Sequence, residues 1–142
     1  MAMSGQKLFT LAEANGLIPK FESLLRQVQL AYLKVKAIVG PLEESDLTPE
    51  EMERRLLEHP ELRGMLADIQ RSVKMIQETG AVFKGFELGL IDFPALIDGK
   101  IGFLCWQFGE GEIRWWHEIE SGFAGRRPLP GVPPREVSRT VN

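Results

Sequence analysis

The groups in this chain that could do chemistry gather between residues 92 and 126. They include the only cysteine, Cys105, one of the two histidines, His117, and the carboxylates of Asp92 and Glu110. A thiol, an imidazole and a carboxylate are zinc donors, and a cysteine beside a histidine can form a nucleophilic pair. Arg126 adds a charge that suits an anionic substrate, so the set is adequate for acid-base chemistry if its members converge.

Convergence depends on the strands that carry these residues. After the helical part of the chain the hydrophobic period changes to two, which predicts a three-strand antiparallel β-meander. Asp98-Gly99 is a strong two-residue hairpin signal, and Glu110-Gly111 supplies a looser second turn. If both loops hold two residues, Cys105 faces Trp116. The predicted core face then carries Ile91, Phe93, Leu104, Trp106, Phe108, Ile113, Trp115 and His117.

The same register disfavours a metal site. It places Cys105 and His117 on opposite faces of the sheet, so they could share an ion with Asp92 only if a bulge moved one of them. The spacings CxxC, HExxH and HxH, which support a zinc site, do not occur in the sequence. We therefore predict no metal and no cofactor, and structural roles for the cysteine and the histidine.

The opposite face of the predicted sheet holds further candidates for binding. It carries Asp92, Cys105, Gln107, Arg114 and Trp116. Asp92 lies diagonally across from Arg114, which predicts a structural salt bridge, and Pro94 should mark a sheet edge or the end of the first strand. Trp115 and Trp116 cannot bury both rings on the same side, so Trp116 should lie against a loop, a partner subunit or a ligand.

Helices before the sheet should position it. Thr10 and Glu13 form a capping box that opens a short helical turn, a new or kinked helix start is expected near Pro19, and Gly40-Pro41 should end that second helix. Thr48-Pro49-Glu50-Glu51 then opens a short connecting helix. Apolar steps of four and three predict an antiparallel helical hairpin. Its seams are Phe21, Leu25, Val28, Tyr32, Val35 and Val39, and then Leu62, Leu66, Ile69, Val73 and Ile76.

These elements predict an α+β fold, in which the helical hairpin and its short connecting helix pack on the three-strand meander. With 142 residues the chain is long enough for a single core. Residues 1–127 should form one globular domain, and residues 128–142, with four of the nine prolines, a proline-rich C-terminal tail. A remaining apolar stripe on the helices could pair with a second copy, so we expect a homodimer.

Composition limits the classes of partner. A formal charge of -3 gives no electrostatic reason to bind nucleic acid or an anionic membrane, and no apolar run approaches the roughly 20 residues that span a bilayer. One cysteine cannot form an internal disulfide, and no apolar leader precedes the first helix signal, so a cytoplasmic setting is expected. Other proteins and small molecules stay open as partners.

The residues assembled above resemble the bacterial DUF2203 family, a domain of unknown function. The matching residues are Phe9-Thr10, Glu13-Ala14-Asn15, Leu17-Ile18-Pro19, Gly80, Lys84, Gly89-Leu90-Ile91-Asp92-Phe93-Pro94, Leu104-Cys105-Trp106, Gly109-Glu110, Trp116-His117 and Gly122-Phe123-Ala124-Gly125-Arg126. Gly85 stands where family members often have another residue, a tolerated variation in a bend. The family carries no established activity, substrate or cofactor, so the resemblance implies none.

Two hypotheses from different classes follow. The first is a non-catalytic binding or scaffold protein, acting as a homo-oligomer, in which the polar face of the sheet and the loop at 122–126 form a partner or subunit surface. We prefer it because no catalytic constellation is evident. The second is a small-molecule-binding protein or enzyme, with or without a metal, whose polar site consists of Asp92, Cys105, Glu110, His117 and Arg126.

Overall fold

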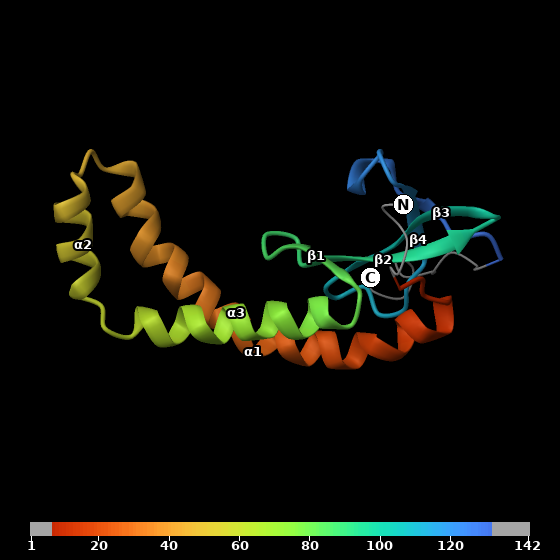
Figure 1. Cartoon of the computed structure of the whole chain (residues 1–142), viewed down its shortest axis with the longest axis horizontal. Coiled ribbons are helices and arrows are strands. Elements are labelled where there is room, and N and C mark those ends of the chain that lie inside the picture. Colours follow the sequence, from red (N-terminus) through yellow and green to blue (C-terminus); the bar gives the residue numbers. More distant parts are fainter. Residues whose placement is uncertain (1–6, 132–142) are drawn as a thin grey trace, which may run out of the picture.

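The computed structural model of the chain describes residues 7–131. Three helices come first in the order of elements (Figure 1): α1 (Leu11–Glu44), α2 (Pro49–Leu57) and α3 (Leu62–Glu78). They are followed by strands β1 (Val82–Gly85), β2 (Leu90–Ile97), β3 (Lys100–Gln107) and β4 (Trp115–Glu118), a short 3-10 helix η1 (Phe123–Gly125), and strand β5 (Arg127–Pro128). The strands pair in sequence order as one antiparallel sheet. The α+β prediction is confirmed, but the meander has five strands and not three.

Both predicted capping boxes form. At the start of α1 the Glu13 N–H donates to Thr10 Oγ1 at 3.0 Å, and the Thr10 N–H donates back to Glu13 Oε1 at 2.9 Å. Thr48 and Glu51 repeat the arrangement at the start of α2. Each pair satisfies two backbone donors that have no partner within the helix. The starts of α1 and α2 therefore follow from local sequence.

The predictions that a new helix starts near Pro19 and that the helix ends at Gly40-Pro41 are wrong. The helix continues through Pro19, although a proline inside a helix costs about 3 kcal/mol because it removes a hydrogen bond and crowds the preceding turn. Ile18 and Phe21 on either side of it are both buried in the core, so tertiary packing outweighs the local penalty. The helix also continues past Gly40-Pro41 and ends at Glu44, where the Ser45 N–H donates to the Leu42 carbonyl.

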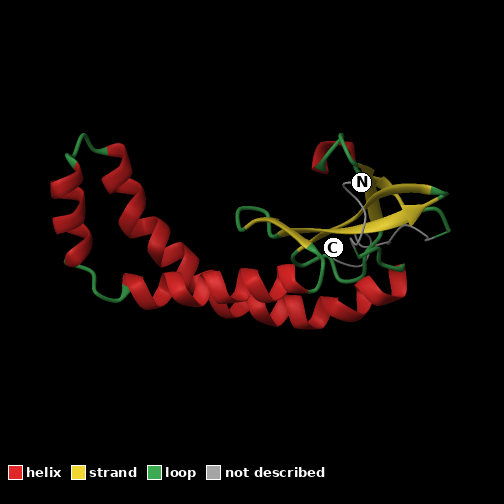
Figure 2. Cartoon of the chain, in the orientation of Figure 1, coloured by secondary structure: helices red, strands yellow, loops and turns green. Residues whose placement is uncertain are grey.

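The sheet covers only part of the helical layer. In Figure 2 the strands lie over the first half of α1 and the end of α3, while the rest of the helices projects beyond the sheet. Residues 29–61, which include the second half of α1 and all of α2, contain no buried residue. We call this segment the helical arm.

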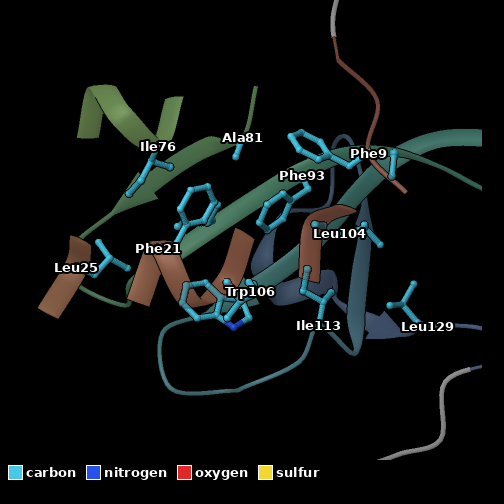
Figure 3. Packing of buried hydrophobic residues seen from close by; sticks show 14 of the residues in the cluster. Phe9, Phe21, Leu25, Ile76, Ala81, Phe93, Leu104, Trp106, Ile113 and Leu129 are labelled. Atoms are coloured by element: carbon cyan, nitrogen blue, oxygen red, sulfur yellow. The ribbon is translucent and has the colours of Figure 1, made fainter. Parts of the chain in front are cut away.

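The core lies between the sheet and the packed pair of α1 and α3. Figure 3 shows Phe21 of α1 and Ile76 of α3 against Phe93 of β2 and Trp106 of β3. Phe21 stacks on Phe93 with ring centroids 5.9 Å apart, and Phe9 meets Phe93 edge to face at 5.2 Å. The predicted core residues of β2 and β3 are therefore correct.

The hairpin between β2 and β3 has the predicted register. Cys105 pairs with Asp92 across it, and the turn is Asp98-Gly99 with both φ angles positive, as a two-residue turn of this kind requires. Pro94 does not end β2, as one alternative predicted. It pairs with Phe103 of β3. Pairing of β2 with β1 stops at Asp92, before Pro94, and the Pro94 carbonyl accepts a hydrogen bond from the Phe9 N–H at 2.7 Å.

The predicted register between β3 and β4 is wrong by one residue. His117 pairs with Phe103 and Cys105 pairs with Trp115, whereas the prediction paired Cys105 with Trp116. Neighbouring residues of a strand point to opposite faces, so this offset reverses every side chain of β4. Trp116 packs against the core, and His117 joins Asp92 and Cys105 on the opposite face.

The offset has a physical cause in the connection between the two strands. Residues 108–114 separate β3 from β4, so the loop is longer than the two residues assumed. Contacts with other parts of the chain fix the path of this loop. The Ile113 N–H donates to Asn15 Oδ1 of α1 at 2.8 Å, and the Ile113 side chain is buried in the core. The Trp106 indole also donates to the Gly111 carbonyl.

The predicted tail begins against the domain. Pro128 belongs to β5, Leu129 is buried in the core, and the Leu129 N–H donates to the Arg114 carbonyl at 2.9 Å. The rest of the tail, from residue 132, lies outside the described residues. Among residues 7–131, no helix has the length and apolar character needed to cross a membrane.

Candidate functional site

Three of the candidate residues meet on the face of the sheet opposite the helices. Asp92 comes from β2, Cys105 from β3 and His117 from β4, and one ligand-type atom of each lies within 4.8 Å of the other two. All three residues are buried, with at most 3% of their surface exposed. We call them the Asp-Cys-His cluster. The prediction that Cys105 and His117 lie on opposite faces is wrong because of the register of β4.

Hydrogen bonds determine how the imidazole of His117 is oriented. Its Nδ1 lies 2.7 Å from the Glu118 carbonyl oxygen, and because a carbonyl can only accept, Nδ1 carries a proton. Its Nε2 lies 2.9 Å from Asp92 Oδ2, so a second proton is shared between that nitrogen and the carboxylate. The ring is therefore held at both nitrogens, with Nε2 directed into the cluster. The Phe103 ring lies 5.4 Å away, centroid to centroid.

The thiol of Cys105 is a poor nucleophile in this setting. Burial, followed by the negative charge of Asp92, raises the pKa of the Cys105 thiol to about 12. A thiolate attacks and a thiol does not, so near neutral pH the folded chain holds almost none of the reactive form. The arrangement does not support a cysteine-histidine nucleophilic pair.

Glu110 and Arg126 form a second pair directly beside the cluster. The Arg126 guanidinium donates to both carboxylate oxygens of Glu110, at 2.8 and 2.9 Å, and also to the Cys105 carbonyl at 3.2 Å. It lies over the rings of Trp115 and Phe123, 5.0 and 4.7 Å from their centroids. Burial lowers the pKa of Arg126, but the hydrogen bonds and charges of its partners outweigh this and leave its pKa raised. The pair links the loop at 122–126 to β3.

The remaining two candidates lie elsewhere. Trp116 is half-buried against the core, on the face opposite the cluster, with the Arg127 guanidinium 5.4 Å from its ring centroid. Arg114 lies 3.5 Å from Glu112, and the predicted partner of Arg114, Asp92, is paired with His117. Five of the seven candidates thus converge: Asp92, Cys105, Glu110, His117 and Arg126.

Sequence reasoning missed two backbone contributions to this site. The Glu118 carbonyl, which sets the proton position of His117, carries no sequence signal. The Gln107 N–H donates to Glu110 Oε1 at 2.7 Å and so positions the carboxylate that holds Arg126. The three-residue spacing of Gln107 and Glu110 around a glycine-rich turn was the one available hint of this bond.

The chain matches the family described as "Uncharacterized conserved protein (DUF2203)" over residues 7–129, which is most of its length. It therefore belongs to this family, as the resemblance of its motifs suggested. Neither the curated proteins nor the solved structures provide a match to it.

Proposed function

We propose that this member of the DUF2203 family is a non-catalytic scaffold protein that acts as a homodimer, and that two copies pair through the helical arm. The observation that carries the proposal is the absence of any buried residue from 29 to 61, a segment that is nevertheless largely helical. Isolated helices of this length are marginal in water, and most helical stability in proteins comes from packing of an apolar face.

The arm presents leucines that its own chain leaves uncovered. Leu30 is 62% exposed, Leu33 is 52% exposed and Leu57 is 72% exposed. Full burial of one leucine contributes about 1.5 to 3 kcal/mol. Burial of the exposed parts of these leucines in two copies therefore contributes about 6 to 11 kcal/mol, the same order as an association cost of about 4 to 15 kcal/mol.

Charge along α2 favours a second copy as the occupant. The first turn of the helix carries Glu50 and Glu51, the last turn carries Arg54 and Arg55, and none of its residues is buried. In a dimer with twofold symmetry, two α2 helices that cross antiparallel place the acidic end of each beside the basic end of the other. The same surface thus complements itself.

The second candidate function is small-molecule binding or catalysis at the polar site. Its specific support is the convergence of five predicted residues around β3. We rank it second because the cluster is buried and the Cys105 thiol is protonated. A surface pocket at the base of the arm contains none of the five; its lining includes Leu25, Gln29, Phe86, Leu88, Gly89 and Phe108.

Sedimentation equilibrium of the full, tag-free chain tests the homodimer. The wild type should behave as a dimer, and Leu30→Glu with Leu57→Glu should yield a folded monomer, because two carboxylates per copy would be buried without partners. Leu96→Glu is the matched control, since Leu96 is 61% exposed but lies on β2, away from the arm. A monomeric wild type, or a double variant that stays dimeric with native circular dichroism, would overturn the proposal.

A further inference from the structure

We propose that Asp92, Cys105 and His117 bind one divalent transition-metal ion of the zinc class, and that this ion fastens the three central strands of the sheet to one another. The inference concerns the face of the sheet opposite the helices and does not depend on the helical arm. It rests on the donor set, its burial and the arrangement of the imidazole.

The donor set matches zinc in chemistry, and its atoms lie near the spacing that zinc requires. Sulfur and imidazole nitrogen suit zinc and its neighbours, whereas calcium and magnesium take oxygen ligands. Bonds of about 2.0 to 2.3 Å place tetrahedral ligands roughly 3.3 to 3.8 Å apart. The ligand atoms of Asp92, Cys105 and His117 all lie within 4.8 Å of one another, and His117 Nε2 lies 2.9 Å from Asp92 Oδ2. A small opening of the Asp92–His117 contact would admit the ion.

The imidazole of His117 already has the orientation of a metal ligand. Histidines that bind metals donate their second ring N–H to a carbonyl or carboxylate, which fixes the tautomer and the ring plane. Here the Nδ1 proton is donated to the Glu118 carbonyl, and Nε2 points at Asp92 and into the cluster. Loss of the shared proton leaves Nε2 with its lone pair directed to the ion.

The charges of the ligands match that of the ion. A divalent ion bound by a carboxylate, a thiolate and a neutral imidazole has zero net charge together with its ligands. Burial of the site therefore requires no new uncompensated charge, which would be costly.

Nearby groups hold the ligands in place. Arg126 donates to the Cys105 carbonyl at 3.2 Å, and its own position is set by Glu110. Each ligand comes from a different strand, and the cluster is closed to solvent. An ion held by three strands at a buried site would cross-link the sheet, so we assign it a structural role, with a fourth donor such as a buried water completing the three protein ligands.

Titration of the tag-free, chelator-treated full chain with Zn²⁺ and Co²⁺ tests the proposal. One ion should bind per chain, Zn²⁺ should raise the Tm by several degrees at saturation, and Co²⁺ should give sulfur-to-cobalt charge-transfer absorption. Cys105→Ser keeps the side-chain volume and should abolish that absorption and weaken Zn²⁺ binding by more than about tenfold. His59→Ala is the matched control, because His59 is the only other histidine and is partly exposed.

The wild-type titration decides the matter even if a variant fails to fold. Absence of Zn²⁺ and Co²⁺ uptake by the wild type would overturn the proposal. Binding without charge-transfer absorption would exclude Cys105 as a ligand and overturn it as well. So would binding that survives Cys105→Ser unchanged, or that disappears with His59→Ala.

Discussion

The side chains of His117 and Asp92 contact each other on the buried face of the sheet opposite the helices, with Nε2 and Oδ2 2.9 Å apart and each side chain less than 5% exposed. The two residues belong to strands that are not neighbours, since β3 lies between them. Their contact passes beside Cys105, the β3 residue that pairs with both Asp92 and Trp115. It therefore ties the two hairpins of the central sheet together.

Asp92→Asn should strongly destabilise the chelator-treated protein. The amide carries no charge and so removes one partner of the buried His117–Asp92 pair, and removal of one partner from a buried pair costs about 3 to 5 kcal/mol. Urea unfolding followed by circular dichroism measures the loss. Asp98→Asn is the control, because Asp98 is exposed in a turn at φ 53° and asparagine tolerates that conformation. Equal stability of the two variants would contradict the expectation.

Arg126→Lys should lower the free energy of unfolding by about 1.5 to 3 kcal/mol. Lysine keeps the charge but cannot donate to both Glu110 oxygens and the Cys105 carbonyl in the same planar geometry. Arg127→Lys provides the comparison, since Arg127 is exposed and lies 3.8 Å from Glu118. That exposed pair should contribute less than about 1 kcal/mol. A similar loss for both variants would show that the planar fork of Arg126 is unimportant.

Stability of the chelator-treated protein should fall in the alkaline range because of Cys105. The folded pKa of the thiol is about 12, and an unfolded cysteine ionises near pH 8.5, so between these values the folded chain holds a proton that the unfolded chain has lost. The stability conferred by the buried thiol is complete below about pH 8.5 and is lost as pH rises toward 12. Unfolding free energies of wild type and Cys105→Ser should thus differ in slope above about pH 8.5; parallel curves would contradict the shift.

Two glycine substitutions should change stability in opposite directions. Gly64→Ala in α3 meets no atom within 4 Å and should stabilise the protein by about 0.5 to 1 kcal/mol, because alanine restricts the unfolded chain. Gly89→Ala would place its Cβ 2.7 Å from Phe108 Cβ, at a φ of +63° that favours glycine, and should destabilise it. Thermal unfolding of the two variants beside wild type measures both signs. A Gly89→Ala protein as stable as Gly64→Ala would refute the predicted close approach.

Local sequence determined those parts of the protein that depend on neighbouring residues. The capping residues Thr10 and Thr48 start their helices as predicted, since a cap needs only a partner three residues away. Asp98-Gly99 set the register of β2 against β3, because a two-residue turn leaves a single pairing. The chemistry-bearing residues of the site were likewise evident from their types, and five of the seven converge.

Tertiary structure alone decided where those residues point. The Ile113 N–H is held by Asn15, 98 residues earlier in the chain, and no turn signal near Glu110 could reveal that contact. It sets the course of the loop into β4, and the resulting offset of one residue moves His117 from the predicted core face to Cys105 and Asp92. Side chains alternate with a period of two along a strand, so the smallest change in register reverses the face and with it the chemistry of the site.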